Sequence, residues 1–231
     1  MVLEGVKSTS SPRELLSLDF ERPLFRLENH SIWKMALTGE MSREKVAQLI
    51  LLIYPVFAGP GRYLFSAKLS QISSEDGAMM FRQLYEANKK KEADADAGWR
   101  RVGLALDLKE QDFDITADNP SAEACDLVTI IRQHGLRSSP SSAAAVAWAT
   151  EQQLPELMGN LADSLSRNYG LDEGELVHLH YQKSRADEVN KWVEHLLTRY
   201  FDTATPYQIY EARRASWEVI WGWTALIESL N

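Results

Sequence analysis

Three polar residues in the stretch KSRADEVN have the spacing with which one helix presents ligands to a metal ion. Lys183 lies four residues before Asp187 and Asn190 lies three residues after it, so all three fall on one side of a helix. Lysine and asparagine are poor ligands where a metal site would use histidine. Three interpretations therefore stay open: a metal site, the remains of one, or a solvated polar face with an ordinary Lys–Asp ion pair.

A glutamate interrupts an apolar stripe in the helix expected over residues 141–169. The stripe, at spacings of three and four residues, consists of Ala147, Glu151, Leu154, Met158, Leu161 and Leu165. A buried carboxylate must be protonated, paired or coordinated. Pro155 lacks the N–H that would bond to the carbonyl of Glu151, so the helix should open beside the acid. Glu151 is a candidate site residue, with the alternative that it lies at the edge of the stripe and reaches water.

The histidines offer little further support for a metal site. His178 and His180 lie two residues apart and point to different faces of a helix, so they should not bind one ion together. His180 and Asp187 are two turns apart on the same side, so a modest site could use both. The chain contains none of the usual zinc, nucleotide or nucleophile motifs.

Composition and charge narrow the class of protein. The 231 residues are 45% hydrophobic and 25% charged, as in a soluble globular protein, and the net charge of -8 argues against nucleic acid as a partner. The single Cys125 excludes an internal disulfide and suits a reducing compartment. The N-terminus lacks the apolar core of a signal peptide, and the apolar run VAQLILLIYPVFAG is too short for a bilayer. We expect a cytoplasmic protein without a membrane partner.

Helical periodicity dominates the elements that must position these residues, and strand-type alternation is absent. The expected helices cover residues 42–69 with a kink at Pro55, 75–90, 94–106, 122–134, 141–169, 171–200 and 206–230. In the third of these, Ala95, Trp99, Val102 and Leu106 form one apolar stripe. The prediction is a single all-α domain over residues 1–231, with residues 1–15 as a flexible N-terminal segment.

Nearly the whole chain resembles the heme-oxygenase-like superfamily, which includes TenA, pyrroloquinoline-quinone synthase (PqqC) and di-iron oxidases. The stretches that carry the resemblance are NHSIWKMALTGEMSREKVAQLILLIYPVF, LYEANKKKEADADAGWRRVGLALDL, AVAWATEQQLPELMGNLADSLSRNYGL and KSRADEVN. The last falls on a signature written as His, three residues, Asp, two residues, His. The resemblance implies a heme-oxygenase-like bundle of about seven helices, a small molecule bound in a central cavity, and a homodimer.

The resemblance also implies a partial set of iron ligands. The family's carboxylate positions are kept, as Glu86, Glu151 and Asp187. Its histidine positions are filled by other residues: Ala95, Lys183 and Asn190. Because two irons need about six protein ligands, the loss argues against a di-iron centre, although iron bound by the three acids stays an alternative. We hypothesise that the buried Lys183 ammonium supplies the charge a metal would bring. No heme is expected, because only His30 lies near the first helix.

Several functions follow from the resemblance. One is an enzyme of the iron-dependent oxidase group with an altered ligand set, and another is a non-catalytic small-molecule-binding or interaction protein on the same fold. A metal-independent TenA-like hydrolase is a further alternative, with Glu218 in ASWEVIWGW at the position of a TenA glutamate. The candidate catalytic residues are Glu86, Glu151, Asp187 and Lys183. The candidate substrate-binding residues are Asn190, His180 and Glu218. The tryptophans at positions 217, 221 and 223 are interpreted as core and dimer packing.

Overall fold

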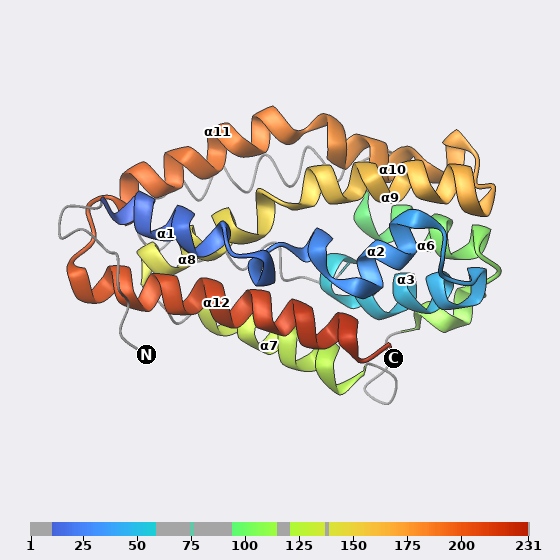
Figure 1. The fold of residues 1–231 in the computed structure, drawn as a ribbon, viewed down its shortest axis with the longest axis horizontal. Helices are drawn as coiled ribbons and strands as arrows, with labels where there is room; N and C mark the ends of the chain where they lie inside the picture. Colours follow the sequence, from blue (N-terminus) through green and yellow to red (C-terminus); the bar gives the residue numbers. More distant parts are fainter. Residues whose placement is uncertain (1–10, 59–74, 76–93, 115–120, 137–138, 231) are drawn as a thin grey trace.

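The computed structural model describes residues 11–58, 75, 94–114, 121–136 and 139–230, and all regular structure in these ranges is helical (Figure 1). The α-helices are α1 (Pro12–Phe20), α2 (Ser31–Thr38), α3 (Arg43–Ala58), α6 (Ala95–Ala105), α7 (Ala122–Leu136), α8 (Pro140–Glu151), α9 (Leu154–Tyr169), α10 (Glu173–Ser184), α11 (Ala186–Leu196) and α12 (Pro206–Glu228). The prediction of an all-α, single-domain bundle is confirmed. The helix expected over 75–90, with Glu86, lies outside the described residues apart from Glu75. None of the described helices combines the length and the apolar character needed to cross a bilayer.

Short-range signals mark where several helices begin and end. Thr205 and Gln208 form a capping box at the start of α12, followed by Pro206 at its first position. Gly170 ends α9 in the left-handed conformation, with a φ of 75°. Ser11 and Glu14 form another capping box, so residues 12–15, expected to be flexible, are the first turn of α1. Residues 1–10 of that expected segment lie outside the described residues.

Two of the expected long helices are each divided in two. The run over 141–169 forms α8 and α9, separated at residues 152–153, because Pro155 cannot supply the N–H that would continue the helix past Glu151. The run over 171–200 forms α10, α11 and the short π-helical turn η4 (Leu197–Phe201), with a break at Arg185. Neither proline nor glycine stands at this second break, so no local signal in the sequence indicated it.

The buried apolar residues form two clusters at opposite ends of the elongated molecule (Figure 1). The larger cluster draws mainly on α2, α3, α6, α7, α9, α10 and positions 215–227 of α12, and its members include Trp33, Ile50, Ile53, Trp99, Leu161 and Trp223. The smaller cluster draws on α1, α8, α11, η4 and positions 212 and 220 of α12, and its members include Leu16, Phe20, Ala145, Trp148, Leu196 and Phe201. The predicted stripe of Ala95, Trp99, Val102 and Leu106 is buried in the larger cluster.

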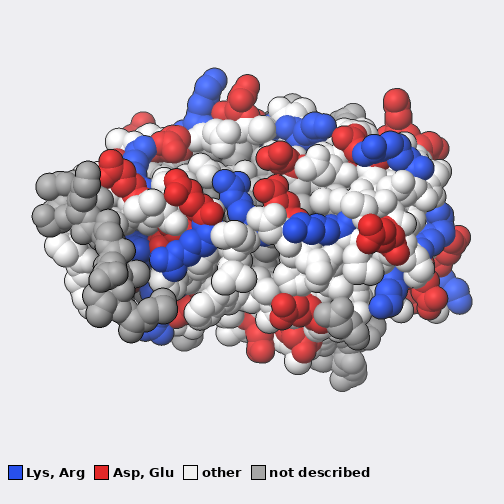
Figure 2. Space-filling view, in the orientation of Figure 1, with Lys and Arg blue, Asp and Glu red and all other residues white. Residues whose placement is uncertain are grey.

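Ion pairs attach α1 to the end of the molecule that holds the smaller cluster. The carboxylate of Asp19, only 1% exposed, accepts hydrogen bonds from Nε and Nη2 of Arg213 on α12 at 2.7 and 2.8 Å. Arg13 donates to Asp202, Glu194 and Thr198, which lie on and after α11. Elsewhere, Figure 2 shows acidic and basic side chains interspersed over one face of the molecule.

Candidate functional site

Glu151 is the last residue of α8, and its side chain is half-buried. The helix break that follows Glu151 has a structural role, because the side-chain amide of Gln153 makes two hydrogen bonds there. Its Oε1 accepts a hydrogen bond from the N–H of Leu27 at 2.9 Å, and its Nε2 donates to the carbonyl of Ala149 at 3.1 Å. The predicted opening of the helix beside Glu151 is therefore present, and it binds the segment between α1 and α2.

The three residues of the KSRADEVN stretch do not share one helix. Lys183 lies on α10, whereas Asp187 and Asn190 lie on α11, beyond the break at Arg185. All three are exposed. The spacing that predicted a single ligand-bearing face therefore does not produce one.

Lys183 pairs with a different acid from those predicted. Its Nζ lies 3.7 Å from Asp163 Oδ2, and the two side chains are 53% and 47% exposed. The aliphatic part of Lys183 lies against Gly159 of α9, where an added Cβ would come within 2.5 Å of its Cδ. Because glycine leaves room for the lysine chain to cross α9, the ammonium reaches Asp163 at the surface. The hypothesis that Lys183 is buried among the predicted acids is therefore wrong.

The metal ligands implied by the resemblance are not assembled among the described residues. Within residues 11–58, 75, 94–114, 121–136 and 139–230, no group of three or more His, Cys, Asp or Glu side chains could hold a metal ion. Ala95, at one of the family's histidine positions, is buried in the larger cluster. Glu86, the third predicted carboxylate, lies outside the described residues, so iron binding that includes it stays a prediction.

Glu218, a candidate substrate-binding residue, is bonded within the protein. Its Oε2 lies 3.0 Å from His134 Nε2 of α7, and its Oε1 accepts a hydrogen bond from Arg214 Nε at 2.6 Å. Burial lowers the pKa of His134, against the opposing effect of the Glu218 carboxylate. The contact between His134 and Glu218 thus links α7 to the middle of α12. The sequence pattern did not predict this contact, because the two residues are 84 positions apart in the chain.

The other candidates on α10 and α12 have separate positions. His180, a predicted substrate-binding residue, is exposed. His178 is buried instead, and its ring lies against Trp99. A Cβ added at Gly98 would lie 2.4 Å from the Cβ of His178. Among the tryptophans of the C-terminal helix, Trp223 is in the core as predicted, whereas Trp221 is 58% exposed. The homodimer stays a prediction.

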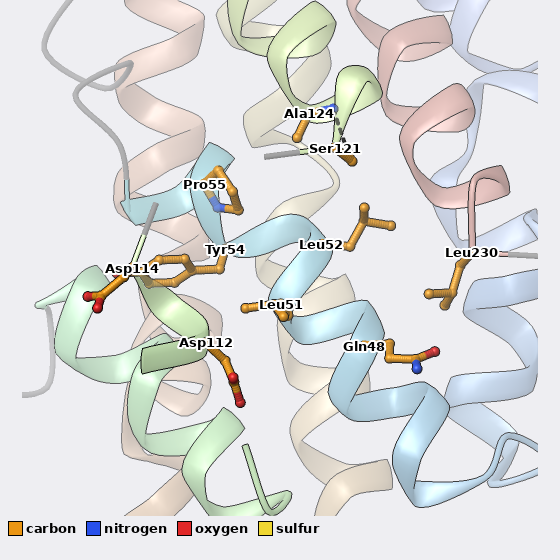
Figure 3. A pocket seen from close by; sticks show the side chains of 10 residues that line it. All are labelled: Gln48, Leu51, Leu52, Tyr54, Pro55, Asp112, Asp114, Ser121, Ala124 and Leu230. Carbon is orange, nitrogen blue, oxygen red and sulfur yellow. Dashed lines mark hydrogen bonds between the residues drawn. The ribbon is translucent and has the colours of Figure 1, made fainter. Parts of the chain in front are cut away.

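A pocket that the sequence did not reveal lies between α3, the 3₁₀ turn η3 (Glu110–Phe113), the start of α7 and the end of the chain after α12 (Figure 3). Its volume is about 200 Å³. The lining residues are Gln48, Leu51, Leu52, Tyr54, Pro55, Asp112, Asp114, Ser121, Ala124 and Leu230. They come from four separate segments, so no local motif could have marked the pocket. Pro55, where a kink was expected, lies inside the continuous helix α3.

The polar groups of this pocket differ in whether they make hydrogen bonds within the protein. Asp112 Oδ2 accepts a hydrogen bond from the N–H of Lys109 at 2.8 Å, and Ser121 Oγ accepts one from the N–H of Ala124 at 3.0 Å. The Tyr54 hydroxyl donates to Asp96, and burial together with that carboxylate raises the pKa of Tyr54. The Asp114 carboxylate is exposed and has no hydrogen bond or ion pair with the other described residues.

Comparison with known proteins leaves the family open. No protein-family model matches the chain, and no curated protein matches it significantly. The geometry alone defines an all-α bundle with an apolar, acid-edged pocket, and the likeness to the heme-oxygenase-like superfamily stays a prediction from the sequence.

Proposed function

We propose that the protein is a non-catalytic small-molecule-binding helical bundle, related to the heme-oxygenase-like superfamily, that has lost the di-iron centre. The observation that supports this proposal is the placement of the KSRADEVN stretch. Asp187 is exposed and Lys183 pairs with Asp163 at the surface, so the stretch behaves as a solvated polar face.

The alternative functions lack an equivalent observation. An iron-dependent oxidase needs imidazole and carboxylate ligands held around a protected metal, and the described part of the chain brings no such group together. A TenA-like hydrolase would need Glu218 directed at a substrate, but both of its oxygens interact with His134 and Arg214. Binding without metal chemistry therefore accounts best for the residues that the structure describes.

Metal analysis tests this proposal. The protein is expressed with added iron and purified, its iron content is measured, and its absorption spectrum is recorded in air. We expect iron far below one atom per chain and no absorption band from iron. Two variants, Asp187→Asn and Asp163→Asn, provide a matched pair of solvent-accessible carboxylates. Near-stoichiometric iron that Asp187→Asn removes and Asp163→Asn retains would overturn the proposal.

A further inference from the structure

We infer that the outward face of α12 is the interface of a homodimer, in which α12 of one copy packs against α12 of a second copy in the opposite direction. The interface is centred on five residues of this helix, here called the α12 stripe: Tyr207, Tyr210, Arg214, Trp217 and Trp221. This inference goes beyond the proposed binding function and does not rest on it.

The α12 stripe leaves large aromatic side chains in contact with water. Tyr207, Tyr210 and Trp221 are 68%, 64% and 58% exposed. Successive spacings of three, four, three and four residues place all five members on one side of the helix. Figure 1 shows α12 at an outer edge of the bundle. Contiguous exposed apolar surface of this kind marks an interaction site.

The tryptophans of the stripe are already held in place by their neighbours. The centre of the Trp217 ring lies 5.6 Å from that of Phe25 and 6.5 Å from that of Trp221. The Arg22 guanidinium lies 5.9 Å from the centre of the Trp217 ring. Because these contacts restrict rotation, little further conformational entropy is lost when a partner covers the rings.

The composition of the helix is also that of an interface. Tryptophan, tyrosine and arginine, which form the whole stripe, contribute most of the binding energy at protein interfaces. Lysine is depleted at interfaces, and α12 contains none. The outward face of α12 therefore has the residue types of a binding surface as well as the exposure.

The order of residues in the stripe favours a second copy of the chain as the partner. Two aromatic residues precede Arg214, by seven and four positions, and two follow it, by three and seven positions. A twofold axis near Arg214 therefore places Tyr207 of one copy opposite Trp221 of the other, and Tyr210 opposite Trp217. A twofold interface between identical chains needs such a self-complementary surface.

The charges on this face are complementary in the same arrangement. Arg214, whose side chain is 68% exposed, has Glu211 three residues before it and Glu218 four residues after it. Near the axis, each arginine therefore has carboxylates of its own chain and of the second copy beside it, which offsets the repulsion between the two guanidinium groups. An anionic lipid surface would be repelled by the same glutamates, so a second copy fits this face better than a membrane.

The size of the face suits a stable dimer. A standard interface buries roughly 800 Å² on each partner. The three exposed rings supply on the order of half of this area, because a tyrosine or tryptophan side chain buries about 150–250 Å². Leu24, which is 81% exposed and precedes Phe25 in the chain, extends the apolar surface beside Trp217.

Sedimentation velocity of the full chain over a range of protein concentrations tests the inference. We expect a reversible dimer, which Trp221→Ser should weaken by about tenfold or more because each dimer contains the residue twice. Leu104→Ser, at an exposed apolar position on α6, is the matched control and should leave the dimer unchanged. A monomer at every concentration, or equal effects of the two variants, contradicts the inference. A monomeric chain that binds anionic lipid vesicles would assign the face to a membrane instead.

Chemical cross-linking tests the position of the twofold axis. In a chain with Cys125→Ser, Arg214→Cys places a thiol of each copy near the axis, whereas Lys191→Cys places it at an exposed position on α11. We expect a short bismaleimide to join two copies through position 214 and not through position 191. Cross-linking at both positions or at neither would refute antiparallel packing about Arg214. Iron content is measured separately, so this inference and the proposed function can each fail alone.

Discussion

The two hydrophobic clusters achieve stability in different ways. The larger cluster contains three fully buried tryptophans, Trp33, Trp99 and Trp223, together with branched aliphatic residues. The smaller cluster combines the alanines of α8 with a few large aromatic residues: Phe20, Phe25, Trp148 and Phe201. Large side chains remove much apolar surface from water, whereas alanines let helices approach closely but bury little area each. The smaller cluster also has fewer members, so it buries less apolar surface in total.

Ion pairs add to the stability of the end of the molecule that holds the smaller cluster. Asp19 and Arg213 join α1 to α12, and Arg13 joins α1 to the end of α11. Because these bonds have directions and partners, they also determine where α1 lies on α8 and α12. One end of the molecule is thus specified mainly by side-chain volume and the other partly by polar pairing.

The largest expected effect is the loss of volume in the larger cluster. Leu161→Ala removes a side chain with no exposed surface and should lower the free energy of unfolding by about 2–5 kcal/mol. Leu196→Ala is the matched change in the smaller cluster, and we expect a smaller loss because α11 packs on α8, whose buried residues are mostly alanines. Urea denaturation with both variants measures the difference. Equal losses of unfolding free energy would show that a buried leucine contributes the same stability in both clusters.

The next effect is the loss of the buried ion pair. Arg213→Met leaves the Asp19 carboxylate buried without its guanidinium and should destabilise the protein by about 2–3 kcal/mol, less than for a fully buried pair because Arg213 is partly exposed. The double variant Asp19→Leu with Arg213→Met should regain most of that loss, since it removes the stranded charge. Urea denaturation of the wild type and of the single and double variants measures these differences in the free energy of unfolding. If Arg213→Met alone is nearly neutral, α1 is held by packing rather than by the pair.

The smallest effect concerns pH and the polar contact between α7 and α12. Burial lowers the pKa of His134 below its unfolded value of 6.5, so the unfolded chain binds a proton more readily. Stability should therefore fall as the pH is lowered through 6.5, with Glu218 opposing the loss and Arg214 adding to it. His134→Gln should show a smaller fall between pH 7.5 and pH 5.5 than the wild type. His180→Gln, at an exposed position, is the control, and an unchanged pH dependence in His134→Gln would exclude this role.

The helical class and several helix ends could be read from the sequence, whereas the candidate site could be read only in part. The apolar stripe from Ala95 to Leu106 and the opening beside Glu151 depend on residues within a turn or two of each other. The break at Arg185 has no such signal, and it removed the single face expected for Lys183 and Asp187. The lining of the pocket comes from four segments, so no spacing along the chain could predict it.

By itself, the sequence determined that the protein folds as helices, where caps such as Thr205 begin them, and which faces are apolar, because these signals act over a few residues. Only the tertiary structure decided which charges meet. Lys183 pairs with Asp163 because Gly159, on a neighbouring helix, leaves room for its chain to cross. Glu218 contacts His134 because α7 packs beside α12, although the two residues are 84 positions apart in the chain. Such pairings depend on distances through space, which the order of residues does not contain.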